Sequence, residues 1–243
     1  MNIRGPSDRR AEWFVPSFGP ERFRLFIGLL FLPYTAMVVS YSVIGSMLAQ
    51  QIHWDRVVAI MAIFFLALGI GGHTLDALGS KGEKPWGTIF PKRTLMVLSF
   101  VSIAGAYAIG IYYMLLYTPL LWLVAIPEGF FLFAYNLEWF NRKYHTDGWF
   151  AFSWGSLPVL AGYILQTNRL SLAVLLMAAA MGLLSLVEIK VSRPYKQLKR
   201  QGDPTSDSVE AGQMQRWESI LKSLSLGIIL LGAGMVAWRL RGV

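Results

Sequence analysis

Long apolar runs separated by short polar stretches dominate the pattern along this chain. Judged by length, about seven of these runs could cross a bilayer. They cover roughly residues 25–48, 56–78, 94–117, 119–138, 148–166, 170–188 and 217–238. A helix satisfies its own backbone hydrogen bonds where water is absent, so apolar runs of this length predict membrane-spanning helices. The expected fold class is all-α, a polytopic membrane helix bundle with about seven transmembrane helices.

The composition agrees with a bilayer environment. Of the 243 residues, 55% are hydrophobic and 15% are charged, whereas soluble domains carry about a quarter of charged residues. The sequence contains no cysteine, which excludes a disulfide framework, a thiolate metal site and a cysteine nucleophile. It also contains no internal repeat and no Gly-rich motif for phosphate or dinucleotide binding.

The whole chain, residues 1–243, is expected to form a single membrane domain. Within it, 1–24 is a cytoplasmic arm, 25–188 holds six spans, 189–216 is a flexible cytoplasmic loop and 217–238 is the seventh span. The first apolar run is longer than the roughly 7–15 residues of a signal-peptide core, so it is interpreted as a retained span. The polar stretch 201–213, rich in Ser, Asp and Gly, is the basis for predicting the loop.

Lysine and arginine are distributed unequally between the two ends of the predicted spans. One end receives Arg4, Arg9, Arg10, Arg22 and Arg24 of the arm and the basic residues of 79–93, 139–147 and 188–216. The other end has only Arg56, Arg169, Arg239 and Arg241. By the positive-inside rule this predicts a multi-pass protein of the cell membrane with a cytoplasmic N-terminus. Topology thus explains the net charge of +8 without a nucleic-acid partner.

The end of the second predicted span carries two ionisable residues, His73 and Asp76. They are three residues apart and therefore share a helix face. Ionisable side chains on an apolar membrane helix are candidates for function, because they need a polar cavity or a partner. The alternative is a helix end that emerges into water, with His73 bonded to a neighbouring span. Both interpretations stay open at this point.

The following loop, 79–93, combines glycines with Lys81, Lys84 and Arg93. Such a mixture could surround an anionic head group such as a diphosphate. The alternative is that these basic residues only mark the cytoplasmic side of the membrane.

More polar residues are expected at the same membrane surface. Asn136, Glu138 and His145 follow the fourth span, and Glu188 closes the sixth. Two carboxylates with an amide or imidazole could hold a hydrated Mg²⁺ against a substrate phosphate. Polar residues at helix ends are, however, common in all membrane proteins.

Glu128 is different because it lies inside its span. It is about nine residues, or about 14 Å, along the fourth predicted helix, which places it near the middle of the bilayer. Pro127 and Gly129 flank it, so a local break in the helix could provide backbone partners. A structural hydrogen bond and a position lining a substrate cavity are both open for Glu128.

Two segments resemble the UbiA-type intramembrane prenyltransferase superfamily. The family has an Asn-Asp-x-x-Asp-x-x-x-Asp motif at the cytoplasmic end of its second span, and 75-LDALGSKGE-83 falls at that place. Asp76 matches the first aspartate and Glu83 the last, whereas Leu75 and Gly79 replace the amide and the middle aspartate. The segment 148-GWFAFSWGSLPVLAGYILQTNRLSL-172 is similar to the fifth span of the menaquinone-pathway branch, which ends in Gly-Tyr-x-x-Gln-Thr.

The resemblance implies a UbiA-like bundle that transfers an isoprenoid chain from an isoprenoid diphosphate, with Mg²⁺ as cofactor. Asp76 and Glu83, which match the motif, are candidate catalytic residues together with His73, and the candidate metal ligands are Asp76, Glu83 and Glu188. The candidate substrate-binding residues are Lys81, Lys84, Arg93, Asn136, Glu138, His145 and Glu128. The family's second Asp-rich motif is reduced here to Glu188, and the family usually has about nine spans rather than about seven.

Three other functions remain as alternatives. The chain could be a non-catalytic relative that binds a membrane lipid or a protein partner. It could be a seven-span hydrolase in which histidines and carboxylates hold zinc, although His53 lies on the opposite side from His73 and His145. A transporter would account for Glu128, but repeated halves and paired broken helices, which are common in such folds, are not evident.

Overall fold

The computed structural model describes residues 12–79, 90–201 and 208–241. Throughout these ranges the regular structure is helical. The elements are α1 (Glu21–Leu29), α2 (Leu32–Met47), α3 (Trp54–Phe64), the π-helix η2 (Phe65–Gly72), α4 (His73–Gly79), α5 (Lys92–Leu116), the 3₁₀-helix η3 (Pro119–Leu121), α6 (Trp122–Asn136), α7 (Asp147–Ala151), the π-helix η4 (Phe152–Ser156), α8 (Leu157–Thr167), α9 (Leu172–Gln201) and α10 (Val209–Leu240).

In the described part of the chain, seven helical stretches are long and apolar enough to cross a membrane, which confirms the predicted all-α, multi-pass architecture. They are Glu21–Met47, Trp54–Gly79, Lys92–Leu116, Pro119–Asn136, Asp147–Thr167, Leu172–Lys199 and Val209–Leu240. The first combines α1 and α2, which meet at Phe31 in the left-handed region with φ 45°. The second combines α3, η2 and α4.

The prediction of a flexible loop over 189–216 is wrong for most of that range. Helix α9 continues to Gln201, and α10 begins at Val209. Hydropathy marks the point where a helix leaves the hydrocarbon, whereas the helix itself continues because Lys, Gln and Leu favour it and Tyr195 is buried. Ser208 caps α10, since its hydroxyl accepts a hydrogen bond from the Ala211 amide at 3.2 Å.

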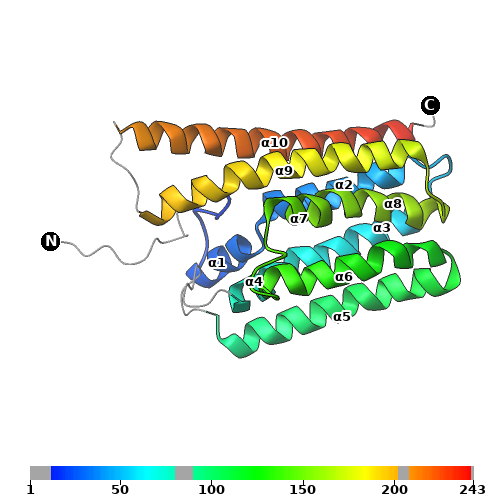
Figure 1. Ribbon diagram of the computed structural model, residues 1–243, viewed down its shortest axis with the longest axis horizontal. Helices are drawn as coiled ribbons and strands as arrows, with labels where there is room; N and C mark the ends of the chain where they lie inside the picture. The colour runs from blue at the N-terminus through cyan, green and yellow to red at the C-terminus, as the bar shows by residue number, and fades with distance from the viewer. Residues whose placement is uncertain (1–11, 80–89, 202–207, 242–243) are drawn as a thin grey trace.

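The long helices run side by side in antiparallel order (Figure 1). Helices α9 and α10 form one edge of the bundle and α5 forms the opposite edge. One end gathers the start of α1, the end of α4, the start of α5, the ends of α6 and α9 and the start of α10. We call this the basic end, because the basic residues counted on one side of the predicted spans lie here wherever the structure describes them. The other end holds the α2–α3, α5–α6 and α8–α9 connections and the end of α10.

Close backbone packing between α2 and α8 fixes the centre of the bundle. A Cβ added to Gly162 would overlap the Ser42 carbonyl, and one added to Gly45 would overlap the Val159 carbonyl. The Ser46 hydroxyl also donates to the Gly162 carbonyl at 3.2 Å. Small residues allow such close approach of membrane helices, so Gly162 of the Gly-Tyr-x-x-Gln-Thr segment has a packing role.

Polar clamps join α3 to α8 at the end opposite the basic end. The Gln166 side chain accepts from the His53 amide at 2.7 Å and donates to the His53 carbonyl at 3.1 Å. Arg56 donates to the carbonyls of Leu165 and Gln166 at 3.1 and 3.2 Å, where the end of α8 leaves such groups unpaired. Gln166 of the family-like segment therefore contributes to the fold at the end far from the site described next.

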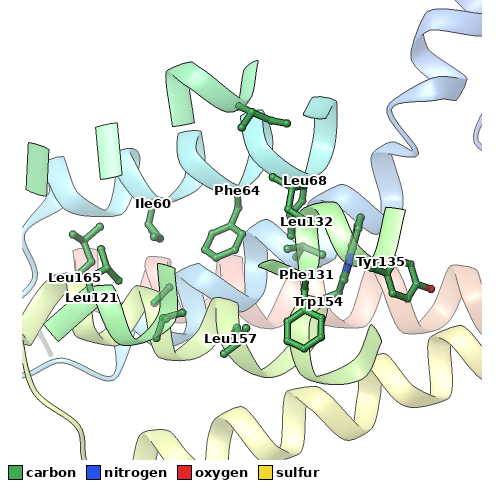
Figure 2. Close-up of a cluster of buried hydrophobic side chains, with 14 of the residues drawn as sticks. Ile60, Phe64, Leu68, Leu121, Phe131, Leu132, Tyr135, Trp154, Leu157 and Leu165 are labelled. Atoms are coloured by element: carbon green, nitrogen blue, oxygen red, sulfur yellow. The ribbon is translucent and has the colours of Figure 1, made fainter. Parts of the chain in front are cut away.

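A cluster of buried apolar side chains fills the space between α3, η2, α6 and α8 (Figure 2). Phe64 and Leu68 come from the second span, Leu132 from the fourth and Trp154 and Leu157 from the fifth. Tyr135 and Trp154 lie at the margin of this cluster, and both also line a polar cavity toward the basic end.

Candidate functional site

A cavity of about 490 Å³ opens among the helices at the basic end. We call it the polar cavity. Its charged and histidine side chains are Asp76, Glu188, Arg142, Arg193, Lys196, His73 and His145, and two amides, Asn136 and Gln197, join them. Its aromatic walls are Phe31, Tyr34, Tyr135, Phe150 and Trp154. Segments far apart in the sequence thus bring basic, acidic and aromatic groups to one place.

Wide helical turns deliver two of the cavity residues. The π-helix η2 ends directly before His73, and the π-helix η4 contains Trp154. The rings of His73 and Trp154 are 5.5 Å apart. π-Helical turns are rare and are found frequently at functional sites, and here both adjoin the same cavity.

His73 is oriented by hydrogen bonding and stacking. The Thr35 hydroxyl donates to the Leu30 carbonyl at 2.7 Å and lies 3.3 Å from the Nε2 atom of His73. A hydroxyl has only one proton to donate, and that of Thr35 is directed at Leu30. The Thr35 oxygen therefore accepts a hydrogen bond from Nε2 of His73. A neutral His73 then has Nδ1 as its acceptor atom, and its ring stacks on Phe31 at 4.7 Å.

Asp76 reaches the cavity because the end of α4 packs closely on the end of α6. A Cβ added to Gly79 would lie 2.5 Å from the Asn136 carbonyl oxygen, so a larger residue would push these two ends apart. Asn136 is buried and donates from its side chain to the Leu132 carbonyl at 2.8 Å. The Asp76 carboxylate makes no ion pair with any residue that the structure describes.

His145 is fixed by Tyr135. Its Nδ1 atom lies 3.1 Å from the Tyr135 carbonyl oxygen, which can only accept, so Nδ1 carries the proton. The two rings stack at 4.3 Å. A neutral His145 therefore has Nε2 as its acceptor atom.

Arg193 joins α9 to the segment around His145. Its guanidinium pairs with Asp147 at 2.9 Å and donates to the His145 carbonyl at 3.3 Å. The same side chain lines the polar cavity. Arg193 therefore both holds the wall in place and contributes positive charge to the cavity.

The turn from Glu138 to Arg142 carries unusual backbone geometry. Glu138, Phe140, Asn141 and Arg142 have φ values of 54°, 55°, 55° and 67°. This left-handed region costs a non-glycine residue roughly 1–2 kcal/mol. Such strain concentrates at functional sites, and here it leads the chain directly to the cavity residues Arg142 and His145.

Glu188 supplies a buried acidic group on α9. It is 6% exposed and lines the polar cavity together with Lys196 of the same helix. Lys196 is the cation whose charge acts on Glu188, and its ammonium group also lies 5.2 Å from the centre of the Phe31 ring. Within 12–79, 90–201 and 208–241, no group of three or more His, Asp or Glu side chains is placed to hold a metal ion.

The structure brings together five of the residues predicted from the sequence. His73, Asp76, Asn136, His145 and Glu188 line one cavity. Lys81, Glu83 and Lys84 lie outside the described residues.

Three further predicted residues lie elsewhere. Arg93 is exposed at the start of α5 and does not line the cavity. Glu138 does not line it either, but pairs at 3.2 Å with Arg142, which does. Glu128 lines a separate apolar hollow deeper in the bundle. Glu128 is far from the polar cavity because it lies inside α6, eight residues before the cavity residue Asn136.

The sequence interpretation missed Arg142, Arg193, Lys196 and Gln197 as site residues. The first three entered it only as a count of basic residues on one side. A signal was nevertheless present, because Arg193, Lys196 and Gln197 are spaced as i, i+3 and i+4. A helix that continues past the sixth span places these three side chains on one face.

Comparison of the chain with known protein families, with characterised proteins and with solved structures finds no match. The likeness to UbiA-type enzymes therefore stays a prediction based on the residues quoted above.

Proposed function

We propose that this chain binds an amphiphile with a phosphate or diphosphate head group in the polar cavity, as a divergent UbiA-like protein of the cell membrane. The observation that carries the proposal is the convergence of Arg142, Arg193 and Lys196 on one cavity in a membrane bundle. Guanidinium and ammonium groups bind phosphate oxygens through charge-assisted hydrogen bonds. His73 and His145 add ring nitrogens to the same lining.

The aromatic walls favour an amphiphile over a free inorganic anion. Phe31, Tyr34, Tyr135, Phe150 and Trp154 line the cavity beside the charged groups. Binding sites of this kind combine apolar walls with a few polar groups that fix orientation. An isoprenoid diphosphate, which has a charged head on an unsaturated apolar chain, matches both parts.

The same proposal includes the orientation in the membrane. The basic end carries most of the lysines and arginines among the described residues, and the positive-inside rule places that end in the cytoplasm. The head group would then enter from the cytoplasmic leaflet. Cysteine-accessibility labelling in intact cells tests this, because a cysteine at position 143 would be labelled only by a membrane-permeant reagent.

Binding can be measured on the full chain in lipid nanodiscs with farnesyl thiolodiphosphate, a non-hydrolysable isoprenoid diphosphate. We expect saturable binding that Lys196→Gln weakens by about tenfold or more, the usual scale for a hydrogen bond to a charged group. Lys190→Gln is the matched control, because Lys190 is exposed on the same helix and does not line the cavity. Absence of saturable binding, or equal weakening by both variants, would contradict the proposal.

Prenyl transfer is a second candidate function, favoured by the Asp76 carboxylate and the buried Glu188 in the same cavity. Mg²⁺ at phosphoryl sites is commonly held by one or two carboxylates together with substrate phosphates and waters. Asp76 and Glu188 fit that donor set, and the metal would polarise the diphosphate leaving group. Asp76→Asn would then abolish Mg²⁺-dependent product formation, while farnesyl thiolodiphosphate binding without Mg²⁺ would persist. Turnover unchanged by Asp76→Asn would remove this mechanism.

A further inference from the structure

A second hollow, separate from the polar cavity, lies among α3, α5 and α6. Its volume is about 80 Å³. Its walls include Phe64, Leu68, Ala106 and Val124, and only Glu128 and Tyr107 bring polar side-chain atoms to it. Glu128 lies eight residues before Asn136 on α6, about 12 Å deeper along the helix. We call this site the Glu128 hollow.

Glu128 presents an unpaired acceptor to this hollow. Its Oε1 atom is buried and has no hydrogen-bond partner within the described ranges. A buried polar atom without a partner costs about 1–3 kcal/mol, and lipid offers no water to pair with it. A ligand that supplies one hydrogen-bond donor would offset this unfavourable term.

Tyr107 provides a second polar group beside the carboxyl group. It lines the hollow together with Glu128, and a Cβ added to Gly129 would overlap its hydroxyl. The absence of a side chain at Gly129 therefore lets the Tyr107 hydroxyl approach α6 next to Glu128. The polar corner of the hollow is built from these two side chains.

The chemistry of the lining selects among possible occupants. A buried water typically makes about three hydrogen bonds, whereas Oε1 of Glu128 is the one buried polar atom of the described lining that lacks a partner. An alcohol needs fewer polar partners, because one hydroxyl can donate to a carboxylate or accept from a carboxylic acid while its carbon chain contacts the apolar walls. Tyr107 and Ala125 are only half-buried, so the hollow reaches the flank of the bundle that faces lipid.

We infer that the Glu128 hollow is a binding site for a membrane-dissolved aliphatic alcohol, whose hydroxyl pairs with Glu128 and whose chain extends toward the lipid. A benzene molecule fills a cavity of about 150 Å³. The 80 Å³ of this hollow therefore accommodates the hydroxyl and the first few carbons. The site is independent of the phosphate groups proposed for the polar cavity.

Photolabelling of the full chain in phosphatidylcholine liposomes tests this inference. The probe is an octanol that carries a diazirine, and the matched control is the same diazirine on octane. We expect saturable labelling by the alcohol in the α5 and α6 peptides that line the hollow, suppressed by unlabelled octanol and not by octane. Equal labelling by the two probes, or labelling spread evenly over lipid-facing positions, would overturn the inference.

Substitutions make the test specific to the carboxyl group. Glu128→Leu, which removes the acceptor, is expected to lower alcohol labelling at least fivefold, and Ala125→Leu, which narrows the hollow, is expected to do the same. Glu128→Gln keeps an acceptor oxygen and retains the labelling. Arg193→Gln, in the polar cavity, leaves it unchanged. Unchanged labelling of Glu128→Leu would contradict the inference, and if that variant does not fold, the octanol and octane competition on the original chain decides.

Discussion

The second and fourth spans contribute walls to both the polar cavity and the Glu128 hollow, but the two sites differ in the number of ionisable groups that they hold. In the cavity, Arg193 pairs with Asp147 and His145 donates to a carbonyl. In the hollow, the Glu128 Oε1 atom has no partner among the described residues. Three basic and two acidic side chains line the cavity, whereas the hollow has a single acid among apolar walls.

Depth in the membrane limits the ligand chemistry that each site can serve. The basic end provides several charged groups that meet a multiply charged head group together. A site two helical turns deeper can offer only a single polar contact, because each further buried charge would need its own partner. The two regions are therefore expected to respond differently to the same perturbations.

The largest contrast is expected for Arg193→Ala. The substitution removes a cavity cation, the ion pair with Asp147 and the bond to the His145 carbonyl at once. Binding of farnesyl thiolodiphosphate should fall roughly 30-fold or more, because hydrogen bonds to charged groups contribute about 1.5–3 kcal/mol. Alcohol labelling of the hollow should not change. A parallel loss at both sites would mean that Arg193 only maintains the fold.

Replacing one acid in each region by leucine should change stability in opposite directions. Glu128→Leu removes an unpaired buried acceptor and is expected to raise the free energy of unfolding by about 1–3 kcal/mol. Glu188→Leu removes the buried acid that lines the cavity beside Lys196 and should lower that free energy by a similar amount. Thermal unfolding of both variants in the same detergent checks the signs. Equal signs would contradict the contrast between the two regions.

Added salt should weaken head-group binding in the polar cavity but not alcohol labelling in the Glu128 hollow, with a smaller effect than the substitutions above. Raising ionic strength from about 0.1 M to 1 M shortens the screening length from about 10 Å to about 3 Å. Head-group binding in the open polar cavity should weaken severalfold, whereas alcohol labelling in the hollow should stay constant. Titration and photolabelling at the two salt concentrations measure both effects, and a salt-independent head-group affinity would count against charge pairing in the cavity.

The smallest effect is expected for Glu138→Gln, which frees Arg142 from its partner. The pair is 3.2 Å long and partly exposed, and exposed pairs contribute about 0.2–1 kcal/mol. Head-group affinity should therefore change by no more than a few-fold. Lys143→Gln, in the same turn but not lining the cavity, is the matched control. A loss as large as that of Arg193→Ala would give Glu138 a direct role.

The sequence predicts the number and type of the spans because hydrocarbon imposes a minimum length on every one of them. It also predicts that His73 and Asp76 share a face, since both lie on one short helix. The end of α9 cannot be predicted in this way, because the sequence becomes polar after the sixth span while the helix continues to Gln201.

Other parts of the site depend on tertiary packing and leave little signal in the sequence. The left-handed turn at Glu138–Arg142 uses no glycine, and the two π-helices interrupt otherwise ordinary apolar runs. The pairing of Arg193 with Asp147 is recognisable only once α7 is known to lie beside α9. Glu128 is separate from the polar cavity because it lies deep inside the fourth span, a position that the sequence did indicate.

An experimental structure of the full chain with farnesyl thiolodiphosphate bound would show directly whether the polar cavity holds the head group. We predict phosphate oxygens about 3 Å from the side-chain nitrogens of Arg142, Arg193 or Lys196, with the isoprenoid chain against the aromatic walls. Density for the diphosphate at the exposed start of α5 beside Arg93, with the polar cavity unchanged, would contradict it.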